Sequence, residues 1–143
     1  FFDESKGGNS TLYNFSYDVA FGHAVFAYLY QDGFMIASLS DGRHVIPKLA
    51  VKGDGEERMK DGGYYTDVVC GKKCFYILSQ GDVETSGLSG TSSIEVYDYE
   101  GNPMKKINLD IIASHMVYDE INKRVIFSPS MDNDLHVLDY EFE

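Results

Sequence analysis

The sequence predicts an all-β protein built from short antiparallel strands. Eleven tyrosines, nine phenylalanines and many β-branched residues lie between turn-like clusters, and fourteen glycines punctuate the chain. Aromatic and β-branched residues favour strands, whereas glycine, aspartate and asparagine favour the turns between them. The strand-like segments also recur in one order along the chain. At 143 residues, the chain has the length of one domain with a sizeable core.

The clearest hairpin covers residues 93–109. Two strand-like halves flank the sequence Glu-Gly-Asn-Pro at residues 100–103. Glycine and asparagine tolerate a positive φ, and proline presets its own φ, so these residues favour a tight reversal of the chain. We therefore expect a turn at 100–103 between two antiparallel strands.

The same hairpin recurs, which indicates an internal repeat. Three segments match as strands that run into an acidic turn: 34–42, 93–101 and 134–142. A second hairpin precedes each of them, with its turn at residues 22–24, 71–73 and 119–123. The unit is therefore strand, tight turn, strand, loop, strand, tight turn, strand.

Four antiparallel strands in about 40–50 residues are the repeat of a β-propeller blade. We assign one blade to residues 14–49, a second to 64–110 and an incomplete third to 113–143. A generic β-sandwich meander is the alternative. Propellers close with about 4–8 blades, so about three blades do not close a ring. The missing blades come either from a longer chain, which we favour, or from a second copy.

These features resemble a known family. The resemblance rests on the turn Tyr-Asp-Tyr-Glu-Gly-Asn-Pro at 97–103 and the hairpin Met-Val-Tyr-Asp-Glu-Ile-Asn-Lys-Arg-Val-Ile-Phe at 116–127. With the acidic, tyrosine-rich composition, they make nearly the whole chain similar to the TolB-like six-bladed β-propellers, of the exported lipoprotein type found in Bacteroidetes. The resemblance implies that the chain is the C-terminal half of such a propeller. It also implies an exported protein in the periplasm or at the outer membrane, and it implies no activity.

The net charge of −11 bears on the partner. Such a charge disfavours binding to a nucleic-acid backbone or to an anionic membrane surface. The chain has no run of about 18 apolar residues, so the sequence predicts no membrane span. A protein, a peptide or a glycan remains as the partner.

The longest connections indicate where binding occurs. In a four-stranded meander, segments 50–64 and 80–92 lie on the same rim, opposite the tight turns. Long loops on a rigid scaffold commonly carry binding residues. Asp82 and Glu84 would attract a cation or a basic peptide segment, although they are also consistent with a solvated charged fringe. Tyr64 and Tyr65 would either stack on a ligand or pack under the loop.

His115 is the histidine of most interest, because the first strand of each blade lines the central channel of a propeller. It is either a ligand or base in that channel or an ordinary, hydrogen-bonded polar side chain. The sequence contains no Gly-x-Ser-x-Gly elbow, no phosphate-binding glycine loop and no His-x-x-x-His pair. We therefore predict no catalytic residue, no metal site and no cofactor.

Cys70 and Cys74 are the two cysteines, and they flank a predicted turn. This spacing is compatible with a disulfide at the end of a hairpin and equally with two buried thiols. A zinc site would need two further ligands at suitable spacing, and none occurs.

These observations favour a non-enzymatic binding or scaffold module, which engages a protein, peptide or glycan through the rim formed by 50–64 and 80–92. The alternative is a hydrolase or lyase with a site at the mouth of the channel, with or without the assistance of a metal.

Overall fold

The fold is described from a computed structural model of the chain. The structure describes residues 15–29, 33–39, 65–79 and 91–129, together with the backbone of 45–51 and 136–138. Within these residues every regular element is a strand, which confirms the prediction of an all-β protein. No helix long and apolar enough to cross a membrane occurs in this part of the chain.

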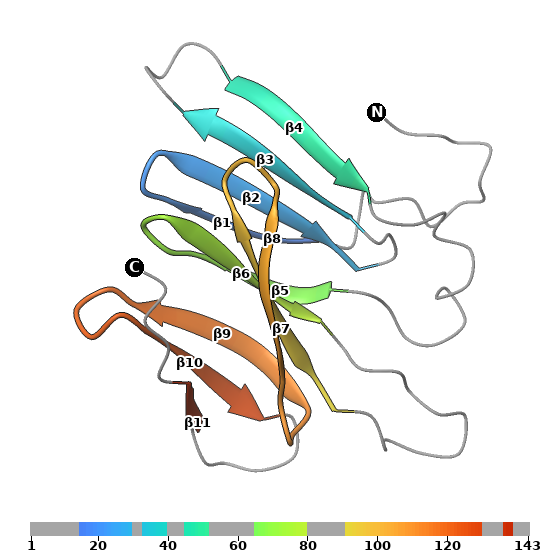
Figure 1. The fold of residues 1–143 in the computed structure, drawn as a ribbon, viewed down its shortest axis with the longest axis vertical. Coiled ribbons are helices and arrows are strands. Elements are labelled where there is room, and N and C mark those ends of the chain that lie inside the picture. The colour runs from blue at the N-terminus through green and yellow to red at the C-terminus, as the bar shows by residue number, and fades with distance from the viewer. Residues whose placement is uncertain are drawn as a thin grey trace, which may run out of the picture.

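In the part of the chain that the structure describes, eleven strands form three antiparallel sheets (Figure 1). The first sheet contains, in order, β1 (Phe15–Ala20), β2 (His23–Tyr28), β3 (Gly33–Leu39) and β4 (Val45–Val51). The middle sheet contains β5 (Tyr65–Cys70), β6 (Cys74–Ser79), β7 (Ser93–Asp98) and β8 (Pro103–Asn108). The third sheet contains β9 (Ala113–Asp119), β10 (Arg124–Pro129) and β11 (His136–Leu138). Strands adjacent in sequence are neighbours within each sheet, so each sheet is a simple meander.

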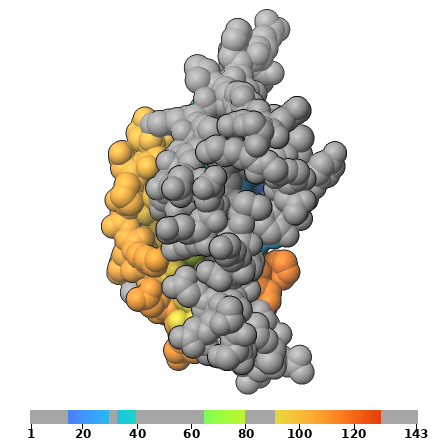
Figure 2. All heavy atoms as spheres, turned by 90° about the vertical axis from the view of Figure 1, so that its right-hand side faces the viewer, coloured from blue at the N-terminus to red at the C-terminus, as the bar shows by residue number. Residues whose placement is uncertain are grey.

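The first strands of the three sheets lie next to one another. β5 packs against β1 on one side and against β9 on the other. Figure 1 shows the first sheet above the third, with β7 and β8 of the middle sheet crossing in front. In the perpendicular view of Figure 2, β7 and β8 form one margin of the molecule. In the middle sheet β5, β6 and β7 are largely buried, whereas β8 is mostly exposed.

Two hydrophobic cores hold the sheets together. Between the first and middle sheets, the ring of Phe34 packs edge-on against Phe75, with ring centroids 5.2 Å apart, and at a tilt against Tyr97, with centroids 4.7 Å apart. Between the middle and third sheets, Tyr76 and Leu78 pack with Met116 and Phe127. All six residues of β6 are buried. Since alternate side chains of a strand point to opposite faces, β6 contributes to both cores.

The turn between β1 and β2 differs from the prediction. The sequence placed it at 22–24, but Ala20 pairs with His23, so the loop consists of Phe21 and Gly22 alone. Their φ angles are 52° and 77°, as a two-residue hairpin turn of type I′ requires. A phenylalanine is rarely found at a positive φ, and this is why the sequence did not reveal the turn.

The hairpin predicted at 93–109 is confirmed, although its turn covers residues 99–102 and not the expected 100–103. β7 ends at Asp98 and β8 begins at Pro103. The Asp98 carboxylate accepts hydrogen bonds from the backbone N–H of Glu100 and Asn102 at 3.0 and 2.8 Å, and Gly101 has a φ of 88°. These hydrogen bonds lower the pKa of Asp98, the largest cause being the bond from the Asn102 side chain.

Candidate ligand-binding groove

A groove lies where the first strands of the three sheets meet. Its volume is about 480 Å³. It is lined by residues of β1, β5 and β9 and of the turns that follow β1 and β9: Tyr17, Asp18, Ala20, Phe21, Asp67, Val68, Val69, Cys70, Met116, Val117, Tyr118 and Glu120. The three strands bring together residues about 50 positions apart in the sequence, as the 51-residue separation of Ser16 and Asp67 illustrates.

Apolar and aromatic side chains of the groove are open to solvent. Tyr17 and Val117 are each 63% exposed, and Phe21 is 37% exposed. Phe21 reaches from the β1–β2 turn to Tyr118 of β9, where the two rings meet edge to face at 6.4 Å. Single exposed apolar residues are normal on a protein surface, but a group of them around one groove is typical of a binding site.

Asp18 joins the first sheet to the middle sheet. One carboxylate oxygen accepts a hydrogen bond from the backbone N–H of Val19 at 2.9 Å, and the other accepts from the N–H of Cys70 at 2.8 Å. Because β5 is the edge strand of its sheet, the N–H of Cys70 has no neighbouring strand on that side. The carboxylate supplies the acceptor that a further strand would otherwise supply.

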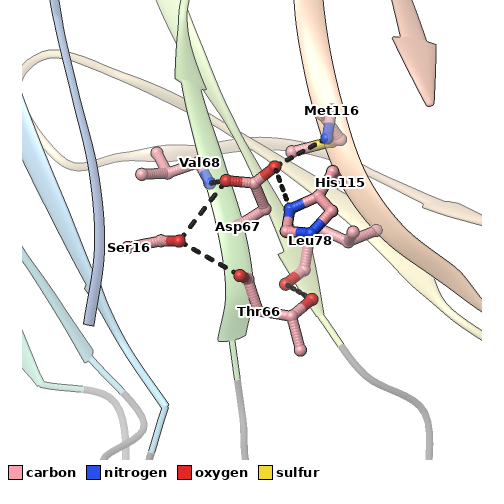
Figure 3. A network of polar contacts seen from close by, with 7 residues as sticks. All are labelled: Ser16, Thr66, Asp67, Val68, Leu78, His115 and Met116. Carbon is pink, nitrogen blue, oxygen red and sulfur yellow. Dashed lines mark hydrogen bonds and ion pairs between the residues drawn. The ribbon is translucent and has the colours of Figure 1, made fainter. Parts of the chain in front are cut away.

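Asp67 joins the middle sheet to the third sheet in the same way (Figure 3). Its Oδ1 accepts from the N–H of Val68 at 2.9 Å, and its Oδ2 accepts from the N–H of Met116 at 2.6 Å. Ser16 of β1 donates to Oδ1 at 3.4 Å and to the carbonyl oxygen of Thr66 at 3.1 Å. We call Asp18 and Asp67 the bridging aspartates, since each connects the first strands of two adjacent sheets.

His115 lies on β9 beside the bridging aspartate Asp67. Its Nδ1 is 3.6 Å from Oδ2 of Asp67, and its side chain is 78% exposed, whereas that of Asp67 is 15% exposed. Figure 3 shows the ring directed at this carboxylate. Among the described residues, no group of three His, Cys, Asp or Glu side chains is arranged to hold a metal ion.

The structure places the other predicted binding residues away from this groove or does not describe them. Tyr65 is 2% exposed and belongs to the core between the first and middle sheets, and its hydroxyl donates to Glu95 Oε2 at 3.4 Å. Its position agrees with packing under the loop and not with stacking on a ligand. Tyr64, Asp82 and Glu84, with almost all of the rim formed by 50–64 and 80–92, lie outside the described residues.

Cys70 and Cys74 are both buried and not joined by a disulfide, which decides between the two alternatives that the sequence left open. Cys70 belongs to the core between the first and middle sheets, whereas Cys74 belongs to the core on the other face. Burial raises the pKa of the Cys70 thiol to about 11. A thiol with such a pKa is protonated at neutral pH, so Cys70 is a weak nucleophile.

His23 and Tyr99 form a further aromatic contact, which no sequence pattern predicted. The two rings stack at 3.7 Å with an interplanar angle of 9°. Nδ1 of His23 is buried without a hydrogen-bond partner among the described residues, and burial lowers the pKa of this histidine. The hydroxyl of Tyr99 donates to the carbonyl oxygen of Gly71 at 2.6 Å, and burial raises the pKa of Tyr99. The ring stack and the hydrogen bond together connect the start of β2 to the turn between β5 and β6.

The bridging aspartates were missed by the sequence analysis, although a signal was present. Asp18 and Asp67 each precede a valine on the first strand of a four-stranded unit, at Asp18-Val19 and Asp67-Val68. A charged residue that recurs at the same place in two first strands indicates a specific polar contact, because an unpaired buried charge is costly. Tyr17 and Val117 carried no such signal, since their exposure depends on how the sheets are arranged.

Fold and groove together define a class: an all-β protein of antiparallel meander sheets, with a solvent-open groove along their first strands. No family model, curated protein or solved structure matches the chain.

Proposed function

We propose that the chain is a non-enzymatic binding or scaffold module, and that a protein, peptide or glycan partner occupies the groove along β1, β5 and β9. The observation that carries this proposal is the exposure of Tyr17 and Val117, each 63%, at a groove of about 480 Å³. Rigid strands linked by the bridging aspartates position these side chains before a partner arrives. Such preorganisation favours binding because little conformational entropy is lost on association.

The proposal includes the arrangement of the sheets as blades of a β-propeller. Three features support it: the repeated meander order, the row of first strands, and the packing of the middle sheet between its neighbours. In this arrangement the groove is part of the central channel. The six-bladed TolB-like form, the blade limits 14–49, 64–110 and 113–143, the neighbouring blades or second copy, and an exported location belong to the same proposal. They rest on the sequence pattern.

The rim formed by 50–64 and 80–92 remains part of the proposed binding surface. Its contribution rests on loop length and on the charges of Asp82 and Glu84. Reversing both charges should weaken partner binding if the partner extends from the groove to the rim.

The hydrolase or lyase alternative rests on one observation, the pairing of His115 with Asp67. A carboxylate at Nδ1 is the arrangement that orients a histidine for acid–base catalysis. The alternative is tested by metal analysis and by assays with ester and glycoside substrates. Activity or stoichiometric metal that is lost in His115→Ala would favour the enzyme over the binding module.

A peptide-display library and a glycan array, probed with the whole chain, test the binding proposal. We expect selected ligands to lose affinity for Tyr17→Ser. Met104→Ser is the matched control, because Met104 is 50% exposed on β8 and does not line the groove. If no ligand is selected, or if both substitutions weaken binding equally, the groove is not the binding site.

A further inference from the structure

The groove is acidic as well as apolar. Asp18, Asp67 and Glu120 are among its lining residues, and none of the described residues that line it is a lysine or an arginine. Lys72 and Lys73 follow β5 in its turn, and neither lines the groove. The groove therefore combines a negative charge with an accessible apolar surface.

The two bridging aspartates are held in place before any ligand binds. Asp18 accepts one N–H at each carboxylate oxygen, from Val19 and from Cys70. A carboxylate offers about four lone-pair sites, so the described contacts of Asp18 leave acceptor capacity. Fixed carboxylates need no reorganisation when a cation approaches, which makes their attraction more effective than that of mobile surface acids.

Aromatic residues line the groove together with these acids. Tyr17, Phe21 and Tyr118 line the same groove, and Phe21 is held there by a backbone with a φ of 52°. An ammonium or guanidinium group is attracted to the face of an aromatic ring, in addition to its attraction to a carboxylate. A groove lined by both acidic and aromatic residues is thus complementary to a cation that also carries apolar atoms.

We propose that the groove binds a lysine or arginine side chain presented by a basic peptide segment of a partner protein. This inference rests on the proposed binding function and specifies its ligand. Lysine and arginine combine a charged head with an apolar stem, as the groove combines acids with apolar walls. The net charge of −11 would also attract a basic segment at long range and accelerate its association.

The probe is a fluorescein-labelled peptide, Gly-Ser-Lys-Gly-Arg-Ser-Gly, with its binding to the whole chain followed by fluorescence anisotropy. A second peptide carries glutamate in place of both basic residues, and a third carries serine. We expect the basic peptide to bind most tightly and to lose affinity between about 50 and about 300 mM salt, because salt screens charge–charge attraction.

Two variants with matched controls assign the binding to the groove. Tyr17→Leu keeps an apolar side chain but removes the ring, and Glu120→Gln removes one charge from an exposed side chain. Each should weaken binding of the basic peptide about two- to fivefold, as expected for one exposed cation–π contact or one surface ion pair. The controls are Phe15→Leu, an exposed ring on the same strand outside the groove lining, and Asp110→Asn, an exposed acid outside it. Both should bind as the unmodified chain does.

The outcomes separate this inference from the proposed function. Equal binding of the three peptides, or equal losses in the variants and controls, overturns the inference of a cationic ligand. If library-selected neutral or acidic ligands depend on Tyr17, the inference fails while the binding module stands. If neither the library nor the basic peptide yields groove-dependent binding, both fail.

Discussion

At the scale of single residues, the bridging aspartates do the most to hold the sheets in position. Asp67 receives the N–H groups of Val68 and Met116 and a hydroxyl from Ser16, which come from three different strands. A backbone N–H that loses its acceptor in a partly buried place costs more than an ordinary exposed hydrogen bond.

Replacing Asp67 by alanine should therefore lower the free energy of unfolding by about 1–3 kcal/mol, since the N–H of Met116 loses its acceptor. Urea denaturation of the two proteins measures the difference. Asp110→Ala serves as the control, because Asp110 is exposed and should change stability by less than about 0.5 kcal/mol. An unchanged midpoint for Asp67→Ala would show that the bridge is dispensable.

His23 should make stability depend on pH. Burial lowers its pKa from the ordinary value of 6.5, so the unfolded chain binds a proton more readily than the folded chain does. Stability is then complete above about pH 6.5 and falls as the pH decreases below that value. Denaturation midpoints measured between pH 7.5 and pH 5 should fall less steeply in His23→Phe, which retains a ring to stack on Tyr99. Parallel pH profiles for the two proteins would contradict this.

At the scale of elements, local turn chemistry separates what the sequence predicts from what it does not. The β7–β8 hairpin was predictable, because Asp98, Gly101 and Asn102 specify the turn through their own side chains and backbone angles. The β1–β2 turn was misplaced by one residue, because Phe21 adopts a positive φ that its residue type disfavours. The ring of Phe21 contacts Tyr118, which lies nearly 100 residues later in the sequence, and no local pattern predicts this contact.

Replacing Phe21 should change stability and peptide binding in opposite directions. Asparagine tolerates a positive φ, and the left-handed conformation costs other residues about 1–2 kcal/mol. The exposed ring pair with Tyr118 contributes less, about 0.5 kcal/mol at the low end of its range. We expect Phe21→Asn to raise the free energy of unfolding by about 0.5–1.5 kcal/mol, from the difference between these two effects.

The same Phe21→Asn protein should bind the basic peptide about two- to fivefold more weakly, since a ring is lost from the groove. Thermal denaturation and anisotropy on one preparation measure both effects. A variant that is less stable than the original chain would mean that the turn is not strained.

At the scale of the whole molecule, the middle sheet should be the most stable part. β6 is paired with β5 and β7, and all its residues are buried between two cores. Its amides should exchange with solvent deuterium at least about tenfold more slowly than those of β1, whose alternate residues are exposed. Hydrogen exchange with mass spectrometry measures this. Equal protection of β1 and β6 would argue against a central sheet that stabilises the two outer ones.

The sequence predicted less at this scale than at the scale of elements. Strand order within the four-stranded units followed from the repeat, because neighbouring strands are joined by short turns. The groove did not follow, since it depends on Tyr17, Asp67 and Val117 meeting across three sheets. Of the residues singled out in advance, Tyr65 and His115 lie on strands that border the groove, and neither of them lines the groove itself.

The bridging aspartates also bear on how the protein avoids assembling with itself. An unpaired strand edge can pair with a strand of another molecule and so start fibril formation. Carboxylates already occupy the outward amides of Cys70 and Met116, so an incoming chain finds no matching row of donors. Removing both carboxylates would leave these strand edges free to start fibril formation. Thioflavin T fluorescence should then rise in the variant and not in the native protein.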